Sequence, residues 1–219
     1  ERHSNVLELI SAAAEFEELK RASLTGAEAQ RGEPGAIAGE KLARHLNPYP
    51  RGHWLYTESV DERLDELKAA KLEDARRCYT DLVGATGAQF VAVGDFNPDA
   101  LSKLLEELFG GWQSPAPYAR IPARYFEREP LEQVVPTPDK ANAVLRAAVN
   151  LPLRDDNPDF PALILGNYLL GGTSSARLPA RVREKEGLSY STYSYLSAGS
   201  LDAAGVFGLS SIYAPENRA

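Results

Sequence analysis

The residue types that most often carry catalysis are sparse in this sequence. The three histidines, His3, His45 and His53, belong to neither an H-E-x-x-H nor an H-x-x-E-H zinc motif. His45 and His53 are eight residues apart with two prolines between them, so they do not share a helical face as ligands one turn apart would. We therefore expect packing or surface roles for the histidines and no metal site in this chain.

Cysteine and serine nucleophiles are equally weakly supported. Cys78 is the only cysteine, which excludes an intrachain disulfide, and no basic cluster is clearly placed against it. We expect an ordinary helix residue at this position. A serine nucleophile would need a G-x-S-x-G elbow, which the sequence lacks.

The run Gly171-Gly172-Thr173-Ser174-Ser175 resembles an anion-cradling turn at the start of a helix. It lacks the lysine and the spacing of a phosphate loop, so the sequence does not favour nucleotide binding. A small-anion-binding module that uses residues 171–175 stays open as one function of the chain.

Composition describes a globular chain that is 43% hydrophobic and 25% charged over 219 residues. No apolar run approaches the roughly 18 residues of a membrane span. The net charge of −7 argues against a nucleic-acid partner, and all of it falls in residues 1–113, with 13 basic and 20 acidic side chains. The chain opens on Glu1 and contains no methionine, so we expect a processed product or a fragment.

The spacing of apolar residues and the helix-capping residues predict the secondary structure of the first half. Helical periodicity predicts helices over 6–30, 36–46, 60–70 and 72–82. A β-rich run over 89–93 is followed by Asn97-Pro98-Asp99, in which Asn97 is a good N-cap and Pro98 suits the first helical position. This pattern predicts a strand, a capped turn and a helix that ends at Gly110.

The second half restarts after a proline-rich stretch. Residues 114–138 hold 6 of the 15 prolines, which predicts an inter-domain linker, with a long loop inside one domain as the alternative. A short strand over 131–135 is one option within it. Beyond it we predict a strand over 143–150, a helix opened by Asn157-Pro158-Asp159, and a second helix over 176–185, capped by one of residues 173–175. Two antiparallel strands over 190–196 and 203–211 follow. This order favours an α+β fold with helices packed on an antiparallel or mixed sheet.

Three motifs stand close together: Leu-Leu-Gly-Gly at 169–172, Ser-Ser-Ala-Arg-Leu at 174–178 and Arg-Glu-Lys-Glu-Gly-Leu-Ser-Tyr at 183–190. Together they resemble a signature in the C-terminal half of the pitrilysin/insulinase family of zinc metallopeptidases. Residues 90–98 and 110–112 are similar to a V-V-G-D-x-x-P…F-G-x-W segment of the family. Tyr49-Pro50-x-x-His53 fits the loop ahead of it. The motifs stand in the expected order and cover most of the chain.

The resemblance implies repeated α+β domains, similar to those of mitochondrial processing peptidase, paired into two halves that enclose a chamber. It makes residues 1–113 the later part of one domain, 114–138 the connector and 139–219 the first, truncated part of the next. The family's zinc ligands and general base come from its first domain, and no motif here matches them. We therefore expect an inactive peptidase domain, a non-catalytic half that holds no cofactor itself, with Zn²⁺ in the parent protein.

The resemblance also implies a site. Arg183 and Tyr190, seven residues apart, match an arginine and a tyrosine of the family that reach the active site. A guanidinium and a phenol aimed at a substrate carbonyl would stabilise the negative charge of a tetrahedral intermediate. The alternative is that Arg183 pairs with a glutamate and Tyr190 packs in the sheet. Substrate contacts are expected from Gly171, Gly172, Ser175, Arg177 and Ser189, and the backbone of 189–195 as a strand edge for an extended peptide.

The expected partners are a peptide substrate and a zinc-bearing half of the same protein or of a partner subunit. Neither nucleic acid nor a membrane is expected. A truncated second domain has exposed strand edges, which predicts low stability or homo-oligomers formed through those edges. The periplasm is the expected location, with the cytoplasm as the alternative. A purely structural, inactive homologue that scaffolds a partner subunit is the alternative function within the family.

Overall fold

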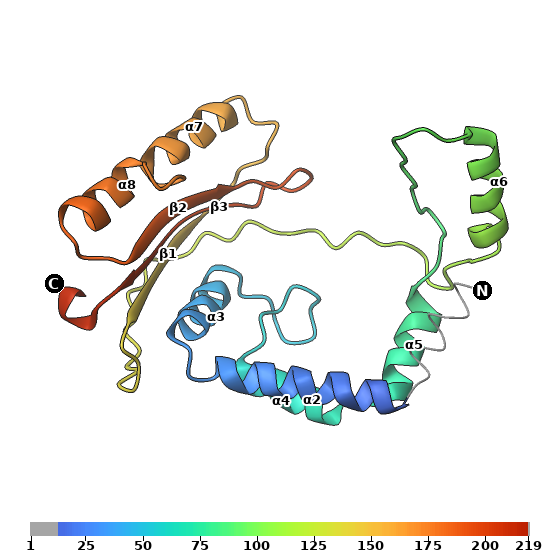
Figure 1. Ribbon diagram of the computed structural model, residues 1–219, viewed down its shortest axis with the longest axis horizontal. Helices are drawn as coiled ribbons and strands as arrows, with labels where there is room; N and C mark the ends of the chain where they lie inside the picture. Colours follow the sequence, from blue (N-terminus) through green and yellow to red (C-terminus); the bar gives the residue numbers. More distant parts are fainter. Residues whose placement is uncertain (1–12, 219) are drawn as a thin grey trace. The chain divides into compact units, whose positions relative to one another are not determined.

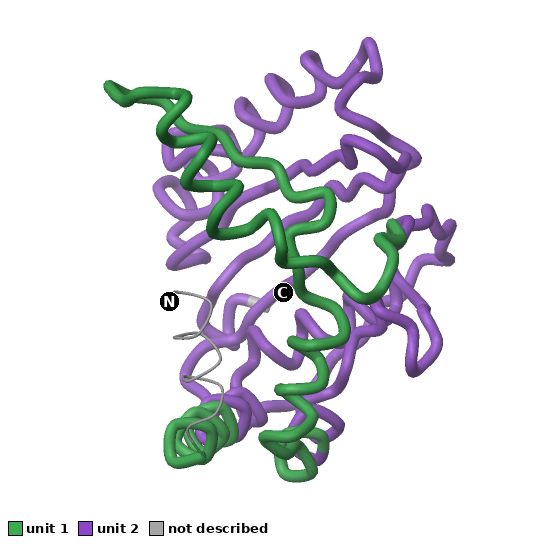
Figure 2. Tube along the Cα trace, turned by 90° about the vertical axis from the view of Figure 1, so that its right-hand side faces the viewer, with its two compact units in different colours: residues 1–24, 66–120 green, residues 25–65, 121–219 purple. Residues whose placement is uncertain are grey.

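The computed structural model describes residues 13–218, which divide into two compact units (Figures 1 and 2). Unit 1 contains the described residues of 1–24 and 66–120, and unit 2 those of 25–65 and 121–219. The buried apolar side chains of the described chain belong to unit 2 and are Ala27, Leu46, Tyr49, Leu64, Leu153, Ala176 and Pro179.

The five helices among the described residues of the first half lie where the apolar spacing and the caps predict them. They are α2 (Ala13–Gln30), α3 (Pro34–Leu46), α4 (Val60–Ala69), α5 (Leu72–Leu82) and α6 (Pro98–Phe109). Residues 6–12 of the first predicted helix lie outside the described residues. The predicted cap of α6 is confirmed, because the Ala100 amide donates to Asn97 Oδ1 at 3.0 Å. Cys78 is an exposed residue of α5.

The start of α4 carries a capping box. The Ser59 amide donates to Glu62 Oε2 at 2.8 Å, and the Glu62 amide donates to Ser59 Oγ at 3.1 Å. The Tyr56 hydroxyl lies 2.8 and 2.9 Å from the two carboxylate oxygens of Glu62, and Arg44 Nη1 lies 3.4 Å from one of them. One carboxylate therefore fixes both the helix start and the loop that precedes it.

Unit 2 is built on a three-stranded antiparallel sheet. Its strands are β1 (Ala143–Leu151), β2 (Ser191–Ser197) and β3 (Gly205–Tyr213), in the order β1-β3-β2. The register sets Arg146 opposite Ser210 and Ser210 opposite Tyr193, so these three side chains lie in one row. The strands predicted over 143–150, 190–196 and 203–211 are confirmed, and the α+β class with them.

Helices cover both faces of this sheet (Figure 1). Helix α3 lies against β1, where Asn150 Nδ2 donates to Leu46 O at 2.8 Å. Helices α7 (Phe160–Leu170) and α8 (Arg177–Pro179) lie against β2, where Ser194 Oγ donates to Asn167 Oδ1 at 2.8 Å. Alternate residues of a strand point to opposite faces, so the row of Arg146 and Tyr193 belongs to the α3 face and Ser194 to the other.

Within unit 2, His45, His53 and Tyr49 pack around the irregular segment 124–129. Tyr49 stacks on His53 with ring centroids 4.3 Å apart and meets Phe126 edge-on at 5.0 Å. Its hydroxyl accepts a hydrogen bond from the Arg124 amide at 2.8 Å, and His45 Nε2 lies 3.0 Å from Glu129 O. His45 and His53 thus have the packing roles expected for them, while His3 lies outside the described residues.

Two predicted strands are wrong. Residues 89–93 and 131–135 have no regular secondary structure. The described part of unit 1 contains no strand with which 89–93 could pair, and Val91 and Val93 are 84% and 97% exposed. A β-rich run without a partner strand cannot satisfy its backbone or bury its side chains.

Two predicted helix starts also shift. The Asn157 side chain accepts from the Asp159 amide at 2.9 Å and forms a turn, so α7 begins only at Phe160. Helix α8 begins after Ala176 without a side-chain cap, so the capping role predicted for residues 173–175 is wrong. It continues into a π-helix over Ala180–Lys185, and Pro215–Arg218 form a final 3₁₀ turn.

Residues 114–138 contain neither helix nor strand, and the two units divide within them, between Arg120 and Ile121. The domain boundaries proposed from the sequence stay predictions. Among the described residues, no helix combines the length and apolar character needed to cross a bilayer.

The substitution Glu62→Gln tests the capping cluster of α4. Hydrogen bonds from the Ser59 amide and the Tyr56 hydroxyl hold the pKa of Glu62 below its usual value. The stabilisation is therefore complete above the unfolded-state pKa of this carboxyl and is lost as pH falls through its folded-state pKa. We expect Glu62→Gln to lower Tm near neutral pH, and the difference to disappear as the pH falls below the folded-state pKa of Glu62. Thermal unfolding as a function of pH measures this, with the exposed Glu132→Gln as control; a pH-independent difference would contradict it.

Candidate functional site

The α7–α8 loop begins with a close backbone approach at Gly171. The Ser194 amide donates to Gly171 O at 3.0 Å, and a Cβ atom at Gly171 would lie 2.6 Å from both Ser194 N and Oγ. Only glycine fits at this distance. The amides of Gly171 and Gly172 both donate to Asn167 O, at 3.0 and 2.9 Å, and end α7. Gly171 therefore joins the end of α7 to β2, one of the two edge strands of the sheet.

This contact also occupies part of the outer edge of β2. Strand β2 is an edge strand, and an extended peptide could pair only with amides and carbonyls that the chain leaves open. The Ser194 amide already donates to Gly171 O. Pairing of a peptide backbone along 189–195 therefore cannot use the Ser194 amide in this structure.

Ser175 in this loop and Arg177 at the start of α8 are the next predicted site residues. Both are exposed, and Ser175 Oγ lies 3.4 Å from Thr173 Oγ1. Ala176 between them is buried, and its amide donates to Thr173 O at 3.2 Å. The loop thus turns two polar side chains outward around a buried alanine.

Arg183 lies on the π-helix. The Glu186 amide donates to Arg181 O, five residues back, at 3.1 Å, and the turn ends at Gly187, whose φ is +64°. Arg183 Nε lies 3.6 Å from Glu184 Oε1, and the side chains are 51% and 65% exposed. The glutamate pairing considered as an alternative is therefore present. Between exposed groups at this distance it contributes little, so the guanidinium stays accessible.

Tyr190 presents its side chain to solvent. It is 80% exposed, which differs from the alternative in which it packs in the sheet. Its amide donates to Ile212 O at 2.9 Å. Ser189 beside it is only 7% exposed, and its hydroxyl lies 2.7 Å from Ser191 O and 2.8 Å from both Ser211 Oγ and Ile212 O. A fixed backbone thus carries an exposed phenol.

The predicted site residues form one continuous stretch of unit 2, from the end of α7 to the start of β2. No hydrogen bond or ion pair within the described chain joins Arg183 to Tyr190. Their roles, and the substrate contacts expected of Gly171, Gly172, Ser175, Arg177 and Ser189, stay predictions.

A pair that the sequence did not reveal lies on the opposite face of the sheet. Arg146 Nη1 donates to the Tyr193 hydroxyl at 3.0 Å. Hydrogen bonding from Ser210 and from Arg146 lowers the pKa of Tyr193. Arg146 and Tyr193 are 47 residues apart on strands that do not touch, so only the register through β3 brings them together. Arg146 Nε is buried without a partner among the described residues.

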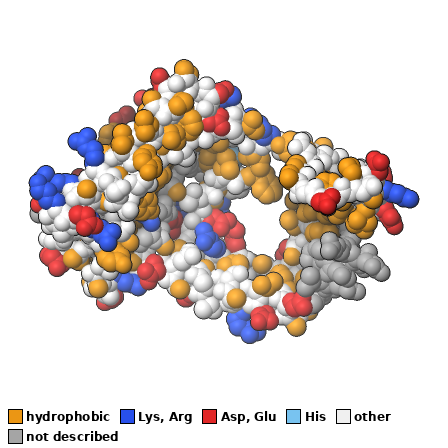
Figure 3. All heavy atoms as spheres, turned by 45° about the horizontal axis from the view of Figure 1, so that its top comes forward, with side chains coloured by type: hydrophobic (Ala, Val, Ile, Leu, Met, Phe, Trp, Pro, Cys, Tyr) orange, Lys and Arg blue, Asp and Glu red, His pale blue; other side chains and the backbone are white. Residues whose placement is uncertain are grey.

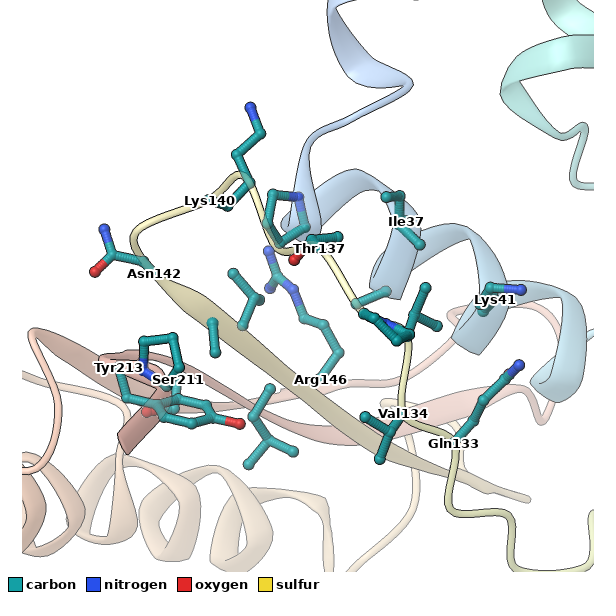
Figure 4. Close-up of a pocket in the computed structure, with 18 of the residues that line it drawn as sticks. Ile37, Lys41, Gln133, Val134, Thr137, Lys140, Asn142, Arg146, Ser211 and Tyr213 are labelled. Carbon is teal, nitrogen blue, oxygen red and sulfur yellow. The ribbon is translucent and has the colours of Figure 1, made fainter. Parts of the chain in front are cut away.

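Arg146 also borders a cavity of about 820 Å³ within unit 2 (Figure 4). Its walls are α3, residues 131–138, the start of β1 and the C-terminal segment. In Figure 4, Arg146 extends from β1 toward α3 and Thr137. Leu188, Ser189 and Asn217, which flank the Tyr190 backbone, belong to the same wall. The described residues include no group of three or more His, Cys, Asp or Glu that could hold a metal.

The substitution Gly171→Ala tests the contact between α7 and β2. The added methyl group would overlap Ser194, so we expect a loss of about 1–3 kcal/mol of stability. The matched control is Gly166→Ala in the middle of α7, where a Cβ atom meets nothing within 4 Å. That control should be neutral or stabilise by up to about 1 kcal/mol. Urea unfolding of both variants measures the difference, and equal stabilities would refute the close approach.

Three solved structures are similar to this chain. A peptidase M16 inactive domain from Pseudomonas fluorescens is 24% identical with a TM-score of 0.72, over 93% of this chain and 48% of that one. A protease from Helicobacter pylori is 17% identical with a TM-score of 0.70, over 92% and 48%. A conserved protein from Enterococcus faecalis is 18% identical with a TM-score of 0.58, over 94% and 47%. The chain thus spans about half the length of these structures, which share its fold.

No curated protein sequence matches the chain. The family model described as the peptidase M16 inactive domain matches residues 69–219, which is more than half of the chain. This match includes the 169–190 signature and agrees with the α+β fold of the M16 inactive domain from Pseudomonas fluorescens. The chain therefore belongs to the peptidase M16 family of metallopeptidases, as a non-catalytic domain of the inactive type.

Proposed function

We propose that this chain forms part of the chamber wall of an M16 zinc metalloendopeptidase and supplies contacts to the substrate during peptide-bond hydrolysis. The observation that carries the proposal is the exposure of Arg183 and Tyr190 on a segment whose backbone is internally hydrogen-bonded. A separate half, in the same protein or in a partner subunit, would hold the zinc and activate water. The described residues offer no ligand set for Zn²⁺, so no step of the chemistry is assigned to a metal in this chain.

The chemistry of the two side chains suits this role. When a peptide carbonyl is attacked, negative charge develops on its oxygen. The guanidinium of Arg183 offers several N–H donors, and the phenol of Tyr190 can donate one hydrogen bond. Donors held in advance near that oxygen lower the barrier because they do not have to reorganise. Before the reaction, the same two donors can bind an adjacent carbonyl of the substrate and hold the peptide in place.

The exposed loop before the π-helix extends the proposed contact surface. Ser175 and Arg177 present an alcohol and a guanidinium beside the peptide, while Gly171 and Gly172 shape the loop and Ser189 lies behind Tyr190. The anion-binding alternative gains no support from this geometry, because the Gly171 and Gly172 amides are already donated to Asn167 O. The proposed partners are therefore a peptide and the zinc-bearing half, in the periplasm, with association of copies through strand edges as a further option.

A scaffolding role is the second candidate, and the surface of α7 favours it. Leu163, Ile164 and Leu165 are exposed on this helix, as are Tyr168 and Leu169. Apolar side chains reach the molecular surface in Figure 3. A helix that is apolar all round is normally covered by protein. A purely structural homologue would use such a surface to hold a partner subunit without taking part in the chemistry.

Reconstitution separates the two roles. The chain is mixed with the zinc-bearing half and Zn²⁺, and hydrolysis of a fluorogenic peptide is followed. We expect Arg183→Ala and Tyr190→Phe each to lower kcat by about 10²-fold, since each removes a donor to the developing charge. The matched controls, Arg181→Ala on the same helix and Tyr168→Phe on α7, should stay within about threefold of the unmodified chain.

Unchanged kcat in both site variants, together with a stable complex of the two halves, would contradict the catalytic contribution and establish the scaffolding role. Analytical ultracentrifugation of each mixture shows whether the complex has formed, so a loss of activity through failed assembly is distinguished from a loss of chemistry.

A further inference from the structure

We infer that Ser189 and Asn217 are positioning residues that fix the backbone from which Tyr190 presents its phenol; this inference rests on the proposed function of Tyr190. It differs from the substrate contact predicted for Ser189 from the sequence. The buried Ser189 hydroxyl faces internal oxygen atoms, so it acts through the chain and not on the peptide.

The segment 187–190 is anchored at consecutive residues. Gly187 takes a left-handed φ of +64°, which lets the chain reverse out of the π-helix. The Leu188 amide then donates to Val182 O at 2.9 Å, and Leu188 O accepts from Asn217 Nδ2 at 3.1 Å. The Tyr190 amide donates to Ile212 O at 2.9 Å. The backbone is thus tied to the π-helix, to β3 and to the C-terminal turn.

Ser189 closes this set of bonds with its side chain. A hydroxyl has one proton, so Ser189 donates to one of the two carbonyls, Ser191 O or Ile212 O, and can accept from the Ser211 hydroxyl. Removal of the hydroxyl leaves Ser211 and a part-buried carbonyl without this partner. Such loss is costly where water cannot replace the bond.

The same segment borders a cavity, and its tyrosine side chain is exposed. Leu188, Ser189 and Asn217 line the wall of the 820 Å³ cavity, and Ser211 is labelled at its edge in Figure 4. The Tyr190 side chain is 80% exposed on the other side. With a cavity behind and solvent in front, the position of the phenol depends on the hydrogen bonds of its backbone. Misplacement of a catalytic group by about 1 Å can cost about 10²-fold in rate.

A double-mutant cycle in the reconstituted peptidase tests the inference. Ser189→Ala should lower kcat by about tenfold with KM nearly unchanged, and Asn217→Ala should have a smaller effect in the same direction. In the Tyr190→Phe background, Ser189→Ala should cost almost nothing further, because the group that it positions has already been removed. The exposed Ser197→Ala, on β2, is the matched control.

Hydrogen exchange of the Tyr190 amide gives a readout that does not depend on activity. We expect exchange to become about tenfold faster in Ser189→Ala, and likewise in Ser211→Ala, which removes the partner hydroxyl. The amide dispersion of the two-dimensional NMR spectrum shows that each variant is folded.

The outcomes separate two failures. Full kcat in Tyr190→Phe would refute the proposed function of Tyr190. A loss in Tyr190→Phe combined with an equal, additive loss from Ser189→Ala in both backgrounds would overturn the positioning role and leave the function standing. Unchanged exchange at Tyr190 in Ser189→Ala would overturn it as well, whatever the activity.

Discussion

The close approach of Gly171 to Ser194 is the constraint on which the site depends. A carbonyl at the end of α7 reaches the amide of an edge strand, and the 2.6 Å that a Cβ would leave makes glycine necessary. The contact fixes where the chain leaves α7, and therefore where α8 and the π-helix begin. Arg183 follows from that point along the chain, while β2, which follows Tyr190, is paired with β3 along its length and is joined to α7 by this contact.

The polar side chains of this region fall into two groups, one bonded to partners inside the protein and one exposed to solvent. Asn167, Ser189 and Ser194 direct their side chains to internal partners, whereas Arg183 and Tyr190 direct theirs to solvent. Exposed groups on an ordered segment are available for a ligand. Their backbone loses its conformational entropy on folding, so this cost does not recur on binding. The family membership and the geometry therefore favour the same stretch of chain, from the end of α7 to the start of β2.

Local signals predicted local structure well. The Asn97-Pro98 cap and the apolar spacing of α3 or α5 need only neighbours along the chain, and those elements form where expected. The 89–93 run fails because a strand depends on a partner that the pattern cannot supply. The 169–190 signature located the candidate site, but it could not show that the Ser189 hydroxyl points inward. It also could not pair Arg146 with Tyr193. The Ser189 contact depends on the pairing of β2 with β3, and the Arg146 contact depends on the β1-β3-β2 strand order.

We propose that this inactive-type M16 domain touches the substrate through Tyr190. The most direct measurement places the photoreactive residue p-benzoylphenylalanine at Tyr190, and separately at the exposed Tyr168, in the complex with the zinc-bearing half and a bound peptide. The account predicts a covalent adduct between peptide and chain at position 190, competed by unlabelled peptide, and none at position 168. Equal labelling at both positions, or no adduct at position 190 in a complex that binds the peptide, would contradict it.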